Sequence, residues 1–237
     1  MAANKLAPDS APWRVPRSVH PSPAALRCYS KFLRFFPEGF RDSIYVERER
    51  GYKWAAHEQW ESTLGRAAFR AMLDEAKYTE IAALALNIES PTNLLVPFER
   101  TALREAITTP AAAEAFACAL YDYLEGNPEP DRFERWVEVL GELPRKQTRL
   151  LTWPLVTVFG FLARPDTHMF LKPSVTRIGA RQYGFELRYH SQPDWDTYDS
   201  LLELAAVIRR DLRDLSPRDM IDLQSFIRVQ GSDEYEE

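Results

Sequence analysis

The chain has 237 residues, of which 45% are hydrophobic and 12% aromatic, and its net charge is −5 at pH 7. A chain of this length and composition can bury a substantial core, which excludes disorder over its whole length. Glycine is scarce, with 9 residues against 17 prolines, and this argues against the glycine-rich loops that bind phosphate in nucleotide-binding α/β folds.

No motif indicates a cofactor or a metal site, and none is expected. The two cysteines, Cys28 and Cys118, do not suggest a disulfide framework, so a reducing, cytoplasmic setting is expected. The longest uncharged run, residues 150–163, has 14 residues. A membrane-spanning helix needs about 20 apolar residues, so membrane insertion is not expected.

Composition divides the chain into four segments. Residues 1–23 contain five prolines, which predicts an extended arm. Residues 24–141 carry apolar side chains every three or four positions, which predicts helices. Residues 142–230 are expected to form one domain with them, and the acid-rich residues 231–237 are expected to form a solvated tail. The predicted fold class is mainly α, a multi-helix globular bundle.

The clearest helix boundaries flank residues 110–125. Thr109 is a favourable N-cap residue, Pro110 suits the first turn, and Gly126 suits the end of the helix. The same periodicity predicts helices before and after this one, over residues 67–76, 78–88, 98–107 and 131–140.

Residues 155–162 are rich in β-branched and aromatic side chains, and residues 185–189 alternate between apolar and polar side chains. Each pattern predicts a short β-strand. Between them Ser174 is expected to cap a helix from Val175 to Tyr183, with Gly184 at its end. A small strand-helix-strand element near residues 155–189 is therefore expected. The chain then returns to helix in two further ranges, 197–215 and 218–229.

The charges of the chain are segregated. Between Pro144 and His190 eight basic side chains stand against Asp166 and Glu186, a net charge of +6, which leaves −11 for the remainder. A local field of one sign concentrates partners of the opposite charge, and Arg177 and Arg181 share one face of the predicted helix. We therefore predict a surface that binds nucleic acid or another anion through Lys172, Arg177, Arg181, Gln182, Arg188, Arg145, Lys146 and Arg149.

Three interpretations of this basic segment, residues 144–190, remain open. It could contact nucleic acid, with basic side chains neutralising phosphates and aromatic side chains stacking on unpaired bases. It could contact an acidic protein partner, or it could dock against acidic stretches of its own chain. The first two make the chain a non-catalytic binding or accessory module, and the third makes it a structural protein that acts through protein contacts.

One catalytic alternative concerns Asp166, Glu186 and Arg188. Pro165-Asp166 and Glu186-Leu187-Arg188 resemble the Pro-Asp and Glu-x-Lys arrangement of metal-dependent nucleases. The resemblance implies that the two carboxylates hold a divalent ion while a lysine assists attack on phosphate. Arg188 replaces that lysine, and arginine cannot release a proton near neutral pH. A non-catalytic role is therefore the first expectation.

Residues 218–229, Arg-Asp-Met-Ile-Asp-Leu-Gln-Ser-Phe-Ile-Arg-Val, are similar to a short segment of uncharacterised bacterial proteins, some of them associated with restriction or defence. This chain has Arg228 where tryptophan is expected in that segment. The resemblance implies an accessory or nucleic-acid-associated module. As a helix, the same residues are expected to bury Met220, Leu223, Phe226 and Ile227.

Overall fold

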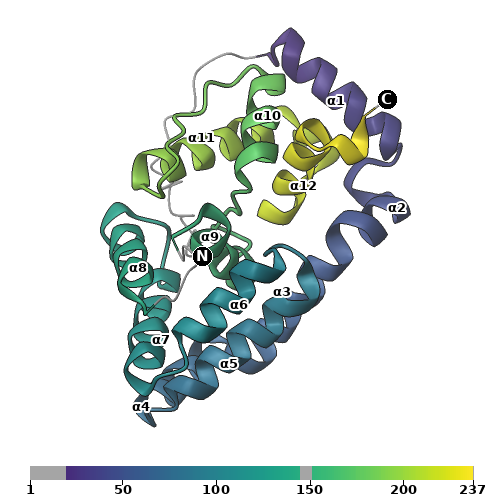
Figure 1. Ribbon diagram of the computed structural model, residues 1–237. Helices are drawn as coiled ribbons and strands as arrows, with labels where there is room; N and C mark the ends of the chain where they lie inside the picture. Colours follow the sequence, from purple (N-terminus) through teal and green to yellow (C-terminus); the bar gives the residue numbers. More distant parts are fainter. Residues whose placement is uncertain (1–19, 145–150, 237) are drawn as a thin grey trace, which may run out of the picture.

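The computed structural model describes residues 20–144 and 151–236. The regular elements in these ranges are helices, and none of the described residues lies in a β-strand, so the mainly α prediction is confirmed (Figure 1). The α-helices are α1 (Pro23–Phe35), α2 (Ser43–Tyr45), α3 (Gly51–Leu64), α4 (Arg66–Asp74), α5 (Tyr78–Glu89), α6 (Pro97–Ala106), α7 (Pro110–Leu124), α8 (Pro130–Glu142), α9 (Trp153–Ala163), α10 (Pro173–Tyr183), α11 (Trp195–Asp211) and α12 (Met220–Gly231).

Shorter helical turns connect several of these elements. The segment η2 (Val46–Arg50) is a π-helix that follows α2 and continues directly into α3. The 3₁₀ turns are η1 (Gly39–Arg41), η3 (Ser90–Thr92), η4 (Arg213–Leu215) and η5 (Asp233–Tyr235). Most of the predicted N-terminal arm, residues 1–19, lies outside the described residues.

Local side chains define the ends of the helices. The hydroxyl of Ser22 accepts a hydrogen bond from the first turn of α1. The hydroxyl of Thr109 does the same for α7, which confirms the predicted cap at that residue. These contacts satisfy backbone donors that have no acceptor within the helix. Gly184 ends α10 with a φ of 77°, the left-handed conformation expected there. The N-cap of α10 is Lys172, and not Ser174 as predicted.

The predicted strand over residues 155–162 is wrong. These residues form the centre of α9, and every residue of this helix is buried. The helix packs against α3, α5, α7 and α8. A helix enclosed by other helices needs apolar side chains on all its sides, and this produces the same continuous apolar run as a buried strand.

The predicted strand over residues 185–189 is wrong for a different reason. Phe185 and Leu187 are half-buried and Glu186 and Arg188 are exposed, so the alternation does reflect one buried face. A strand, however, needs a neighbouring strand to complete its hydrogen bonds, and the described chain provides none. Instead, the hydroxyl of Ser200 on α11 accepts a hydrogen bond from the backbone N–H of Arg188 at 3.1 Å.

The two predicted regions, residues 24–141 and 142–230, are in contact through several helix pairs. In Figure 1, α9 lies between a group formed by α3 to α8 and a group formed by α1, α10, α11 and α12. The contacts that join the regions include those of α3 with α9, α8 with α11, and α1 with α10 and α12.

Helices α10 and α12 are in close backbone contact because of two glycines. A Cβ atom at Gly179 would lie 2.7 Å from the carbonyl oxygen of Ile227, and one at Gly231 would lie 2.0 Å from that of Val175. Both distances are shorter than any van der Waals contact, so larger residues would separate the two helices. The pair then carries α1 on its outer side.

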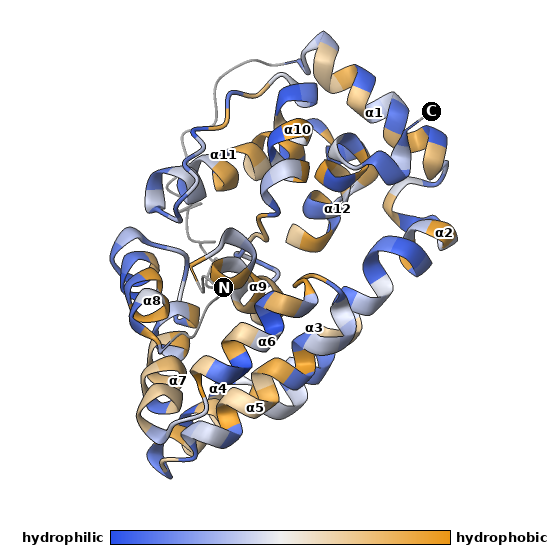
Figure 2. Ribbon diagram, viewed as in Figure 1, coloured by the Kyte–Doolittle hydropathy of each residue, from blue (hydrophilic) through white to orange (hydrophobic). Residues whose placement is uncertain are grey.

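Hydropathy along the helices matches their positions. In Figure 2, α7 shows mainly hydrophobic colours, whereas α3 and α12 alternate between hydrophobic and hydrophilic colours. In α3 most hydrophilic side chains are exposed and Lys53 is buried, whereas α12 buries the polar side chains of Asp222, Gln224 and Ser225. Among the described helices, none has both the length and the apolar character that crossing a bilayer requires.

The C-terminal residues differ from the predicted solvated tail. Gly231 belongs to α12, and Tyr235 is buried against Phe35 and Phe36 of α1. Its hydroxyl donates a 2.6 Å hydrogen bond to Oε1 of Glu49. The sequence predicted a solvated tail because Tyr235 is flanked by acidic residues, and this composition did not indicate that its ring is buried.

A buried histidine in the core makes stability depend on pH. Burial, together with the charge of Arg164, lowers the pKa of His168 from 6.5 to about 4. As the pH falls below 6.5, His168 becomes protonated in the unfolded chain but stays neutral in the folded protein. The free energy of unfolding therefore decreases until the pH reaches about 4. We expect this histidine to account for a loss of about 2 kcal/mol between pH 7 and pH 5.

Urea unfolding of the wild type and of His168→Gln at both pH values measures this effect. Glutamine does not titrate, so the variant should lose less stability between pH 7 and pH 5 than the wild type does. Equal losses in the two proteins would show that folding does not lower the pKa of His168.

Candidate functional site

A buried network of charged side chains joins η2 and α3 to α12. Arg50, at the end of η2, donates two hydrogen bonds to Asp219, at 2.9 and 2.6 Å, and one to Asp222 at 2.9 Å. All three residues are buried. Asp219 also caps α12, because its Oδ1 accepts the backbone N–H groups of the first turn. The wider turn of a π-helix is a common device at functional positions, and here it precedes Arg50.

Asp222 remains ionised inside this network. Burial alone raises the pKa of Asp222, but hydrogen bonds from Arg218 and Tyr45 outweigh that effect and hold the pKa below its ordinary value. The hydroxyl of Tyr45 lies 2.6 Å from Oδ1, and the guanidinium of Arg218 contacts both carboxylate oxygens. The carboxylate therefore has enough donors to be buried as a charge.

One turn further along α3, Lys53 is completely buried. Its ammonium group donates to Glu49 at 3.2 Å, to Gln224 at 2.8 Å and to Ser225 at 2.9 Å. Burial lowers the pKa of Lys53 to about 8. Glu49 also binds Arg228 at 3.0 Å, so the network continues along α12.

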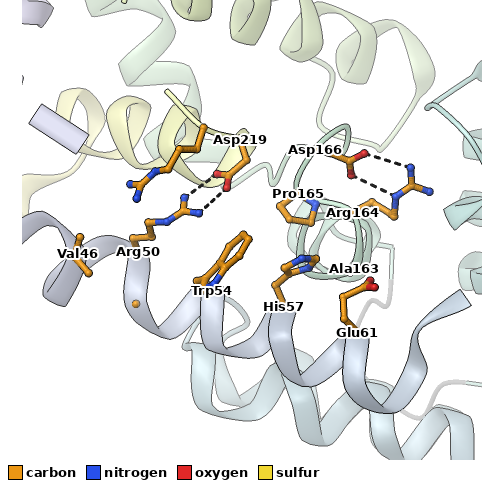
Figure 3. Close-up of a pocket in the computed structure, with 12 residues that line it drawn as sticks. Val46, Arg50, Trp54, His57, Glu61, Ala163, Arg164, Pro165, Asp166 and Asp219 are labelled. Atoms are coloured by element: carbon orange, nitrogen blue, oxygen red, sulfur yellow. Dashed lines mark hydrogen bonds and ion pairs between the residues drawn. The ribbon is translucent and has the colours of Figure 1, made fainter. Parts of the chain in front are cut away.

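A cleft with a volume of about 810 Å³ opens beside the first half of this network. Figure 3 shows Arg50, Trp54 and His57 projecting from η2 and α3 toward the turn at Pro165 and toward Asp219. The guanidinium of Arg50 lies 4.7 Å from the centre of the Trp54 ring. The cleft is therefore formed by three segments that are distant in the sequence.

The orientation of His57 is determined by a backbone carbonyl. Its Nδ1 lies 2.9 Å from the carbonyl oxygen of Leu162. A carbonyl can only accept, so Nδ1 carries the proton and the lone pair of a neutral ring is on Nε2. Glu61, four residues later on α3, also lines the cleft. These two side chains present hydrogen-bond acceptors, which suit a ligand that carries donors.

The positive charges of this cleft are neutralised by neighbouring carboxylates. Arg50 and Arg218 bind the acidic residues that begin α12, and Arg164 binds Asp166 through two contacts of 3.3 Å. Within residues 20–144 and 151–236, no cluster of three or more His, Cys, Asp or Glu side chains is arranged to hold a metal ion. This cleft therefore has the geometry of a ligand pocket but no net attraction for phosphate.

The predicted nuclease residues occupy different surroundings. Asp166 lines the cleft, whereas Glu186 is exposed on the segment after α10 and is not part of the cleft lining. Arg188 is bound to three carboxylates of α11, with contacts of 2.8 Å to Asp196, 3.0 Å to Asp199 and 2.8 Å to Glu203. Among the described residues of the predicted anion-binding set, Arg188 is thus the one whose charge is neutralised by ion pairs.

Other members of the basic segment remain accessible. Arg177 and Arg181 are exposed on α10, and Arg177 lies 4.8 Å from the centre of the Tyr189 ring. Lys172 is half-buried at the N-cap of α10, and Gln182 lines a groove between α10 and α1. The predicted contacts of Arg145, Lys146 and Arg149 lie outside the described residues.

Most aromatic side chains of the basic segment are part of the core. Trp153, Phe159, Phe161, Phe170 and Tyr183 are all buried. They cannot stack on nucleic-acid bases without unfolding the domain. Of the aromatic side chains predicted to stack on bases, only the half-buried Phe185 and Tyr189 at the end of the described segment are accessible.

Helix α1 supplies cations that the sequence analysis missed. Arg27, Lys31 and Arg34 are spaced four and three residues apart, which places them on one face, and α1 contains no acidic residue. All three line the groove beside Gln182, whose volume is about 730 Å³. The spacing was visible in the sequence, but only the tertiary contact of α1 with α10 connects it to the basic segment.

Comparison with protein-family models, curated proteins and solved structures gave no match. The geometry and charge of the described residues therefore carry the functional argument.

The buried network yields a stability prediction. Arg50→Met would leave Asp219 without its guanidinium partner and would leave Asp222 with that of Arg218 alone, and removing one member of a buried ion pair costs about 3–5 kcal/mol. Urea unfolding should show a loss of that size. Arg48→Met, in the same π-helix but exposed, is the matched control and should change stability by less than about 0.5 kcal/mol. A similar, small effect in both variants would contradict the structural role of Arg50.

Proposed function

We propose that the protein is a non-catalytic module that binds nucleic acid through a basic face formed by α1 and α10. This basic face comprises Arg27, Lys31 and Arg34 of α1 and Arg177 and Arg181 of α10. One observation carries the proposal: two helices that pack together contribute five cationic side chains and not a single acidic one.

The linear arrangement of the cations favours a polyanion. From Arg27 to Arg34 the helix rises roughly 10 Å. A nucleic-acid duplex carries about one negative charge per 1.7 Å of its axis, so a row of this length faces several phosphates at once. The groove alongside adds the amides of Gln182 and Gln230, which can donate hydrogen bonds to phosphate oxygens.

The chain as a whole is acidic, and this makes the segregated charge more significant. Neighbouring carboxylates neutralise Arg164 and Arg188, but Arg27, Lys31 and Arg181 have no ion-pair partner among the described residues. Cations such as these three attract an oppositely charged partner through the field that they create. Because the aromatic side chains are mostly buried, the expected contacts are with the sugar-phosphate backbone, and they are independent of base sequence.

Charge reversal on both helices tests this proposal. In Lys31→Glu combined with Arg181→Glu, we expect the affinity for labelled oligonucleotides to fall about tenfold or more at moderate salt, because two phosphate contacts are replaced by repulsion. The salt slope of the logarithm of affinity should also become shallower by about one for each lost contact. Fluorescence anisotropy with duplex and single-stranded probes measures both quantities.

Arg41→Glu combined with Arg104→Glu is the matched control, since both residues are exposed and lie outside the basic face. The control pair should bind like the wild type. Nucleic acid that binds equally to the wild type and to the α1 and α10 variant would refute the proposal. Binding of polyglutamate in place of nucleic acid would identify the face as a surface for an acidic protein.

A further inference from the structure

A smaller cavity, of about 460 Å³, lies where the start of α10 meets α12, η2 and the loop after η3. Four cationic side chains line it: Arg48 from η2, Lys53 from α3, Lys172 from the N-cap of α10 and Arg228 from α12. It shares none of these residues with the basic face. Its charges therefore need an explanation of their own.

The carboxylates around this cavity leave part of its positive charge unneutralised. Glu234 lines it and binds Arg228 at 2.6 Å, while Glu49 is shared between Arg228 and Lys53. The side chains of Arg48 and Lys172 have no hydrogen bond or ion pair with any residue of the described ranges, although the backbone N–H of Lys172 donates to the hydroxyl of Thr176. Two accessible cations therefore face a cavity whose other two cations are already held in place.

Lys53 contributes a positive charge of fixed position to the lining of the cavity. The side chain is completely buried, and its three hydrogen bonds to Glu49, Gln224 and Ser225 fix its position. Burying an ammonium group is costly unless negative charge lies nearby, and burial here already lowers its pKa to about 8. An anion in the cavity would offset part of that cost.

Neutral donors complete the lining. Asn93, which adopts a left-handed conformation with a φ of 55°, and Tyr52 both line the cavity. Ammonium, guanidinium, amide and hydroxyl donors around a small volume are the combination that binds phosphate oxygens.

We infer that this cavity binds a phosphate monoester through Lys172 and Arg48. Its volume is in the range of small-ligand pockets, roughly 300–1,000 Å³, and too small for a duplex. The monoester could belong to a phosphorylated small molecule or to the terminal phosphate of a nucleic-acid strand. The second source rests on the proposed function, and the first does not.

Isothermal titration at constant ionic strength tests the inference with inorganic phosphate and a nucleoside monophosphate as probes. The wild type should bind both, and Lys172→Met and Arg48→Met should each weaken binding by about tenfold or more, because each removes a charge-assisted hydrogen bond. Lys31→Met, a change of the same kind on the basic face, should leave the affinity for both probes unchanged.

Lys172→Gln, which keeps a donor and removes only the charge, repeats the test if the Met variant is destabilised. A wild type that binds neither probe, or Lys172 and Arg48 variants that bind as tightly as the wild type, would overturn the inference.

Oligonucleotides with and without a 5′-phosphate distinguish the two sources. If the strand terminus is the ligand, the wild type should prefer the 5′-phosphorylated strand, and Lys172→Met should abolish that preference. If only the small probes bind, the ligand is a free phosphorylated molecule. Loss of oligonucleotide affinity in the Lys31 and Arg181 variants is measured with unphosphorylated strands, so failure of the basic face and failure of this cavity give different results.

Discussion

The burial of Arg50 and Lys53 against α12 is the constraint on which the rest of the structure depends. Neither cation can leave water without its partners, because an unpaired buried charge costs several kcal/mol. Asp219 and Asp222 must therefore meet Arg50 at the same register at which Gln224 and Ser225 meet Lys53. Residues 218–229 supply these partners, so the polar side chains of this segment have a structural role.

This constraint also decides which charges remain available for binding. In the large cleft of Figure 3 the arginines are held by carboxylates, so the cleft presents an indole, an oriented imidazole and acceptor groups. The uncompensated positive charge lies elsewhere, on α1, on α10 and around the smaller cavity. Helix α10 connects these regions, because its N-cap Lys172 lines the cavity and its Gln182 lines the groove.

The candidate site shows where linear charge counting succeeds and where it fails. Counting between Pro144 and His190 identified the accessible Arg177 and Arg181, but it gave equal weight to Arg188, which three carboxylates of α11 neutralise. It also omitted Arg27 and Lys31, which are about 150 residues away in the chain. Helix packing decides which charged side chains lie close together, and a count of charges along one stretch of sequence does not include that packing.

The sequence by itself determined the local features: the helical class, the cap at Thr109, and the end of α10 at Gly184. These depend on interactions within a few residues. Only the tertiary structure decided that residues 155–162 form a buried helix, since enclosure on all sides and a buried strand produce the same apolar run. It also decided which cations are paired, because electrostatic partners are selected by distance in space and not along the chain.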